Sequence, residues 1–133
     1  MTPRRASVRR EVRIPAPAGE VWGLLGDPGR LGEWFPGVES CRLEEGGRRV
    51  TIANGLELFE EIVTLDPLQR RLQYRVVSGL VAEHLATLDV LDLGEGASLA
   101  LYSVDAAPAM MALVLAGAGA SGLEAVGRRY GGA

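Results

Sequence analysis

The stretch VWGLLGDPGRLGEWFPGVES, residues Val21 to Ser40, decides how the elements of this chain follow one another. Its first part spaces apolar residues as on one face of a helix and stops at Gly26. Asp27 and Pro28 then pair a capping residue with a first-turn proline, which predicts a second short helix. A Pro-Gly pair ends that helix. The stretch therefore predicts two short helices followed by a strand.

The residues before this stretch indicate a first strand. Val8, Val12 and Ile14 keep a two-residue period, and five arginines stand among the first thirteen residues. No apolar run follows these arginines, so they do not form the basic part of a secretory signal. The period favours a solvated first strand, and the alternative is a basic arm for nucleic acid.

The region after Ser40 is predicted to be an antiparallel meander of six strands. Residues 72–76 and 84–90 alternate apolar with polar side chains, which gives the sheet one dry face and one wet face. The inward faces of 56–65 and 97–104 stay open, because apolar residues occur on both sides of each segment. The strands are separated by turn signals at Glu45-Gly46-Gly47, Asn54-Gly55, Asp66-Pro67, Ser78-Gly79 and Gly94-Glu95-Gly96.

The last part of the chain is predicted to be a long helix rich in small residues. Eighteen consecutive residues, from Ala106 to Leu123, carry no charge, which approaches the ~20 residues of a membrane span. Glycine and alanine are frequent and no aromatic belt flanks the run, so we expect no membrane span. The run GAGASG, Gly117 to Gly122, has the spelling of a dinucleotide loop, but with eleven residues left after it we expect no second strand to follow.

Composition limits the chemistry of the chain. Its 133 residues make one domain, 1–133, and a net charge of −3 gives no general attraction to nucleic acid. All fourteen basic residues are arginines, so a side-chain Schiff base is impossible. One histidine and one cysteine cannot form a Cys/His zinc site, which leaves only carboxylate-rich metal binding open, and we expect no metal and no cofactor. The single Cys41 excludes an internal disulfide and predicts a cytoplasmic location.

The succession of these features resembles the START-related SRPBCC superfamily, close to its bacterial polyketide cyclase/dehydrase and lipid transport branch. The resemblance is carried by VWGLLGDPGRLGEWFPGVES at 21–40, NG at 54–55, Glu60, LD at 65–66, LQYRV at 72–76 and GASGLEAVGRR in the last helix. It implies an α+β helix-grip fold, with a seven-stranded curved antiparallel sheet, two short helices after strand 1 and a long C-terminal helix. It also implies an apolar cavity between the sheet and that helix.

The resemblance further implies that Glu60 points inward together with the apolar residues two positions away on its strand. If the two following hairpins have loops with an odd number of residues, Glu60 lies across from Val76, and Val76 lies across from His84. Two strand spacings of ~4.8 Å then separate the backbones of Glu60 and His84. With Tyr74 diagonally adjacent, these side chains would form the polar anchor of an apolar pocket. The alternative puts Glu60 on the solvated face and gives His84 an ordinary hydrogen-bonded place near a strand end.

The candidate ligand-binding residues come from the segment after the second short helix, from the strands and from the last helix. They are Trp34, Phe35, Leu58, Glu60, Ile62, Tyr74, Val76, His84, Ala86, Tyr102, Met110, Met111, Leu113 and Val114. Glu60, His84 and Tyr74 are also the candidates for catalysis. Trp34 either walls the cavity or plugs the space between the short helices and the sheet, and the sequence favours neither.

Two classes of function fit such a cavity. The first is a carrier or sensor of a small apolar molecule such as a lipid, a polyketide or a quinone, which we prefer because no nucleophile is poised by its sequence context. The alternative is a cyclase/dehydrase-like enzyme without metal or cofactor, in which His84 and Glu60 act as general acid and base and Tyr74 or Tyr102 stabilises an enolate or phenolate oxygen. A protein-interaction module is a third class. We expect a monomer or weak homodimer that does not bind nucleic acid.

Overall fold

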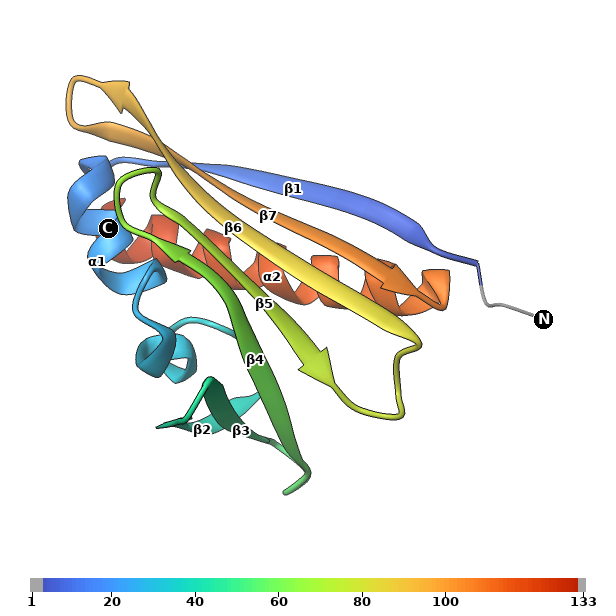
Figure 1. The fold of residues 1–133 in the computed structure, drawn as a ribbon. Coiled ribbons are helices and arrows are strands. Elements are labelled where there is room, and N and C mark those ends of the chain that lie inside the picture. Colours follow the sequence, from blue (N-terminus) through green and yellow to red (C-terminus); the bar gives the residue numbers. More distant parts are fainter. Residues whose placement is uncertain (1–3, 132–133) are drawn as a thin grey trace.

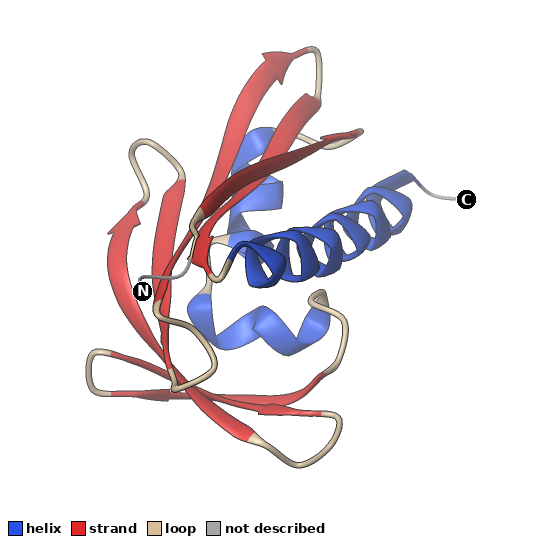
Figure 2. Cartoon of the chain, turned by 90° about the vertical axis from the view of Figure 1, so that its right-hand side faces the viewer, coloured by secondary structure: helices blue, strands red, loops and turns tan. Residues whose placement is uncertain are grey.

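The computed structural model describes residues 4–131, in which an antiparallel sheet curves around the helices (Figure 1, Figure 2). The elements in chain order are β1 (Ala6–Ile14), α1 (Ala18–Leu25), the 3₁₀ helix η1 (Pro28–Glu33), β2 (Val38–Glu44), β3 (Gly47–Ile52), β4 (Glu57–Asp66), β5 (Arg71–Val77), β6 (Glu83–Gly94), β7 (Ala97–Ala107) and α2 (Ala109–Gly131). The seven strands are ordered β1-β7-β6-β5-β4-β3-β2. The predicted α+β helix-grip fold is confirmed.

The helical interruption after β1 has the predicted form, with one difference. The chain leaves α1 at Gly26, and the Asp27 carboxylate accepts a hydrogen bond from the Gly29 N–H at 2.9 Å, which caps η1. The second helix is a 3₁₀ helix and not an α-helix. Its six residues include two glycines, and 3₁₀ geometry is common in helices this short.

A bulge in β4 decides which of its residues point inward. The ladder between β4 and β5 shifts register between Ile62 and Thr64, so Val63 is an extra residue in β4. Up to Ile62 the side chains of β4 alternate between the two faces of the sheet, and Val63 interrupts this alternation. Glu60 lies opposite Val76 in this ladder and is 7% exposed, whereas Val63 at the shift is 44% exposed. The inward orientation of Glu60 is therefore the one that the resemblance implies.

The β5 and β6 strands separate at one end. Their ladder ends at the pair of Tyr74 and Ala86, although β5 continues to Val77. Beyond this point the Val76 N–H donates to Nδ1 of the His84 imidazole at 3.0 Å instead of to a carbonyl of β6. His84 thus replaces a backbone acceptor in the sheet.

The core lies between the concave face of the sheet and the helices, and α2 packs mainly against β1 and β7 (Figure 2). The buried side of α2 is made of Ala112, Ala116, Gly119, Gly122, Leu123 and Val126. By length and composition alone α2 could cross a membrane, and 33% of its most apolar 18-residue window is buried. In this fold α2 packs as the core helix of the domain.

Candidate ligand-binding site

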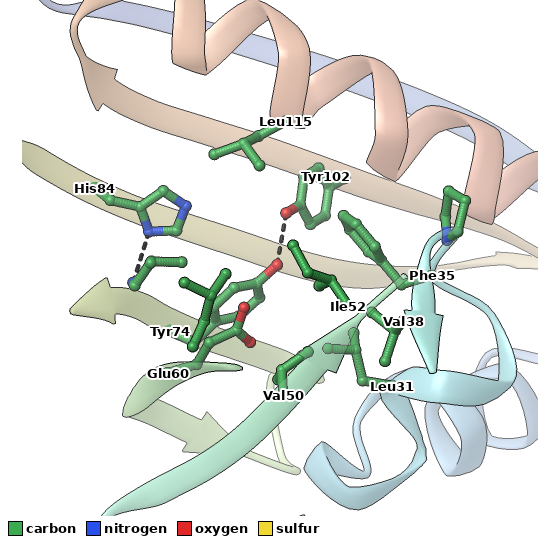
Figure 3. Close-up of a pocket in the computed structure, with 13 residues that line it drawn as sticks. Leu31, Phe35, Val38, Val50, Ile52, Glu60, Tyr74, His84, Tyr102 and Leu115 are labelled. Atoms are coloured by element: carbon green, nitrogen blue, oxygen red, sulfur yellow. Dashed lines mark hydrogen bonds between the residues drawn. The ribbon is translucent and has the colours of Figure 1, made fainter. Parts of the chain in front are cut away.

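A cavity of about 140 Å³ lies between the inner face of the sheet, the segment after η1 and the first half of α2 (Figure 3). Most of its wall is apolar. The cavity is lined by Leu31, Phe35, Pro36, Val38, Val50, Ile52, Leu58, Glu60, Tyr74, Val76, His84, Tyr102 and Leu115. The expected hollow between sheet and helix is present.

The two adjacent aromatic residues after η1 have different positions. Phe35 lines the cavity, and its ring lies 6.0 Å from that of Tyr102, centroid to centroid. Trp34 is 7% exposed, packs edge-on against Phe35 at 5.6 Å and does not line the cavity. Trp34 therefore fills the space between the short helices and the core, and supports Phe35 from behind.

Two glycines of α2 make room for aromatic side chains of the site. A Cβ at Gly119 would lie 2.5 Å from Tyr102 Cε1, and a Cβ at Gly122 would lie 2.8 Å from the Trp34 carbonyl oxygen. Only glycine allows α2 to approach both residues this closely. Gly119 and Gly122 of the GAGASG run thus let a helix pack closely, and the run does not form a dinucleotide loop.

A buried ion pair joins β3 to β4 beside the cavity. Arg48 is 1% exposed, and its Nε donates to Oε1 of Glu60 at 2.7 Å. Its Nη1 donates to the Pro28 carbonyl of η1 at 3.0 Å, and its guanidinium lies 4.5 Å from the centroid of the Tyr74 ring. Nη2 is buried and has no hydrogen-bond partner among residues 4–131. Arg48 thereby holds η1 and Glu60 in fixed positions at one end of the cavity.

The Glu60 carboxyl group has one oxygen free. Within residues 4–131 Oε1 is bound by Arg48, whereas Oε2 accepts no hydrogen bond and is not among the fully buried polar atoms. Glu60 lines the cavity, and Oε2 is its oxygen without a hydrogen-bond partner within residues 4–131. Burial raises the pKa of Glu60 above its ordinary range, and the charge of Arg48 and its hydrogen bond offset only part of that rise.

The His84 imidazole is neutral and has a defined tautomer. Burial lowers its pKa from 6.5 to about 4, so the ring carries no charge at neutral pH. Nδ1 accepts the hydrogen bond from Val76, so the single ring proton must be on Nε2. Nε2–H donates to no atom of residues 4–131 and is not fully buried, and His84 lines the cavity.

Besides Glu60 and His84, two tyrosine hydroxyl groups contribute polar atoms to the cavity wall (Figure 3). The oxygens of Tyr74 and Tyr102 are 2.6 Å apart and share one hydrogen bond. Burial raises the pKa of both phenols well above the ordinary value, so both stay protonated. One of the two hydroxyl protons is used between them, which leaves one for a ligand or a water.

The structure places half of the fourteen predicted site residues in the cavity wall, and none of those in α2. Seven line the cavity: Phe35, Leu58, Glu60, Tyr74, Val76, His84 and Tyr102. Ile62 and Ala86 pack beside it without lining it. Met110, Leu113 and Val114 are 65%, 51% and 56% exposed, and Met111 does not line the cavity. The first half of α2 is apolar or small on every side, so the spacing of its residues does not indicate which side faces inward.

The sequence analysis missed Arg48 and six lining residues of the cavity, which are Leu31, Pro36, Val38, Val50, Ile52 and Leu115. A signal for Arg48 exists, because Arg48, Val50 and Ile52 stand at two-residue spacing on one strand. An arginine within such an apolar series indicates a buried cation that needs an acidic partner. Leu115 lies one residue beyond the predicted α2 positions. No group of three or more His, Cys, Asp or Glu side chains that could hold a metal occurs within residues 4–131.

A curved antiparallel sheet around a long helix, with an apolar cavity between them, defines a helix-grip protein. The family model for "Polyketide cyclase / dehydrase and lipid transport" matches residues 5–131, and the chain belongs to this family. No match is found among proteins with curated descriptions.

Solved structures agree with this assignment of the fold. The protein XoxI from Bacillus cereus is 21% identical, with 94% of this chain and 95% of that chain covered and a TM-score of 0.88. Norcoclaurine synthase from Thalictrum flavum, solved in complex with dopamine and hydroxybenzaldehyde, is 19% identical, with 96% and 87% covered and a TM-score of 0.72. A START superfamily protein from Mycobacterium smegmatis is 16% identical, with 95% and 97% covered and a TM-score of 0.73.

Proposed function

We propose that this protein binds a small, mostly apolar molecule of about one aromatic ring, as a carrier or sensor. The observation that carries the proposal is the cavity of about 140 Å³ with its apolar wall. An apolar cavity of about 150 Å³ in a protein core binds benzene, whereas sites for drug-sized ligands measure about 300–1,000 Å³. The size favours a one-ring compound over the lipid, polyketide or quinone expected from the family resemblance.

Three polar groups give such a ligand an orientation. Glu60, His84 and the pair of tyrosine hydroxyls line the cavity, and everything else in the wall is apolar. Apolar contact supplies most of the affinity in sites of this kind, and a few polar groups supply specificity. A reducing, cytoplasmic setting for this role agrees with the single cysteine.

A second candidate function is proton transfer on the bound molecule. The observation that favours it is the raised pKa of Glu60, a carboxyl group that lines the same cavity as the protonated tyrosine pair. A carboxyl group with a raised pKa is suited to general acid or base catalysis near neutral pH. Hydrogen–deuterium exchange at the carbon next to the carbonyl of a bound aryl ketone, faster with the wild type than with Glu60→Gln, would favour this function over binding alone.

The test of ligand binding uses two neighbouring valines of β5. Val76 lines the cavity, whereas Val77 is 55% exposed on the other face of the sheet. Val76→Phe should fill part of the cavity and weaken toluene binding at least about tenfold, and Val77→Phe should leave it unchanged. Toluene binding is measured by ligand-observed NMR and calorimetry. A wild type that binds neither toluene nor any other one-ring compound refutes the proposal and favours the protein-interaction class.

A further inference from the structure

The polar groups that line the cavity have unused hydrogen-bonding capacity of two kinds. His84 offers one donor, Nε2–H, because its other ring nitrogen is occupied by the Val76 N–H. Glu60 offers one acceptor, Oε2, because Oε1 is occupied by Arg48. A donor and an acceptor without partners within residues 4–131 therefore border the same small volume.

The register of the sheet places Glu60 of β4 and His84 of β6 on its inner face, with Val76 of β5 between them. Glu60 stands opposite Val76, and the Val76 N–H is 3.0 Å from Nδ1 of His84. The Tyr74 ring, from the intervening strand β5, also lines the cavity and lies 5.9 Å from the His84 ring, centroid to centroid (Figure 3). Glu60 on β4 and His84 on β6 therefore border the same cavity from the two sides of β5.

The charges around the cavity select a neutral polar group. Glu60 and Arg48 form a pair in which the charges compensate each other, and the neutral His84 adds no charge. A ligand carboxylate would bring a second buried anion to the free oxygen of Glu60, which is costly in an apolar cavity. A ligand ammonium would lie near the Arg48 guanidinium. A hydroxyl group meets neither repulsion, and it both donates and accepts.

We propose that the ligand class of this site is a neutral one-ring compound with a hydroxyl group, which donates to Oε2 of Glu60 and accepts from Nε2–H of His84. The tyrosine pair keeps one further proton for a second oxygen on the ring. This proposal rests on the proposed function, because it assumes that the cavity takes a ligand. It adds the feature by which the cavity selects among compounds of equal size.

Four probes of similar size test the proposal on the unaltered protein. Phenol has the donor and the acceptor, anisole has only the acceptor, toluene has neither, and benzoate is an anion. Phenol should bind at least about tenfold more tightly than toluene or anisole, because toluene leaves both Glu60 and His84 unpaired and anisole leaves Glu60 unpaired. Benzoate should bind more weakly than phenol at pH values where it is ionised. Toluene binding as tight as that of phenol, or benzoate binding tighter than phenol, overturns the proposal.

A variant and a spectroscopic measurement assign the two contacts. Glu60→Gln, which can turn an amide N–H toward the ligand hydroxyl, should lower the ratio of phenol affinity to toluene affinity at least about tenfold. The chain has one histidine, so ¹⁵N-histidine labelling gives one imidazole. Its Nε2 should resonate as a protonated nitrogen and shift on addition of phenol but not of toluene. An Nδ1–H tautomer, or equal shifts with both probes, overturns the His84 contact.

These outcomes separate the failure of this proposal from the failure of the proposed function. If none of the four probes binds, or if Val76→Phe binds them as the wild type does, the cavity is not a ligand site and both proposals fail. If toluene binds and Val76→Phe abolishes binding while phenol has no advantage, the cavity is a ligand site that does not select a hydroxyl group.

Discussion

Replacing Gly119 by alanine should destabilise this fold, although alanine is the better helix former. The new Cβ would lie 2.5 Å from Tyr102 Cε1, whereas carbon atoms in contact are about 3.5–4.0 Å apart. The Tyr102 ring is 1% exposed and must move by about 1 Å in a packed core. Overpacking of this kind costs about 1–3 kcal/mol, and loss of the hydrogen bond to Tyr74 adds about 1 kcal/mol.

Gly117→Ala is the matched control for this prediction. Gly117 lies two residues earlier in α2, is exposed, and has nothing within 4 Å of a built Cβ. Both variants gain the same helix propensity, up to ~1 kcal/mol, so the difference between them isolates the contact with Tyr102. Urea-induced unfolding should give Gly117→Ala a free energy of unfolding about 2–4 kcal/mol above that of Gly119→Ala. Equal stabilities would refute the close packing of Tyr102 on α2.

Two further predictions concern the buried polar groups. Arg48→Met should lower the free energy of unfolding by about 3–5 kcal/mol, because it leaves Glu60 buried without its cation, and adding Glu60→Leu should recover most of the loss. Urea-induced unfolding of the single and the double variant measures these free energies. An Arg48→Met variant as stable as the wild type contradicts the prediction. The lowered pKa of His84, about 4 against 6.5, means that below pH 6.5 the unfolded chain takes up a proton that the folded chain does not. As the pH is lowered from 6.5 to about 4, the free energy of unfolding should therefore decrease by on the order of 3 kcal/mol relative to that of a His84→Gln variant. Parallel stability curves for the two proteins would refute the shift.

Local patterns in the sequence predict much of the fold and part of the site. Alternation along β5 and β6 shows that Tyr74 and His84 share the inward face, because successive side chains of a strand point to opposite sides. The pairing of Glu60 with Val76 required more than alternation, since apolar residues stand on both sides of β4. The family resemblance supplied the inward orientation, and the bulge after Ile62 explains how β4 adopts it.

The side of α2 that faces the cavity could not be read from the sequence. A helix indicates its buried face by a contrast between apolar and polar sides, and the first half of α2 has none. Contact with Tyr102 and Trp34 decides the rotation, because Tyr102 of β7 and Trp34 after η1 can approach α2 only at Gly119 and Gly122. Leu115 then lines the cavity and Met110 lies in solvent.

The sequence by itself determined the order of the elements, the antiparallel meander and the small-residue helix, because turn residues, capping residues and side-chain periods act over a few neighbours. Only the tertiary structure decided the cavity and its chemistry. Arg48 reaches Glu60 and the Pro28 carbonyl through contacts between residues that are far apart in the chain. The single ring proton of His84 is on Nε2 because β5 and β6 separate beside it. Burial and strand divergence arise when distant segments pack, so no local pattern encodes them.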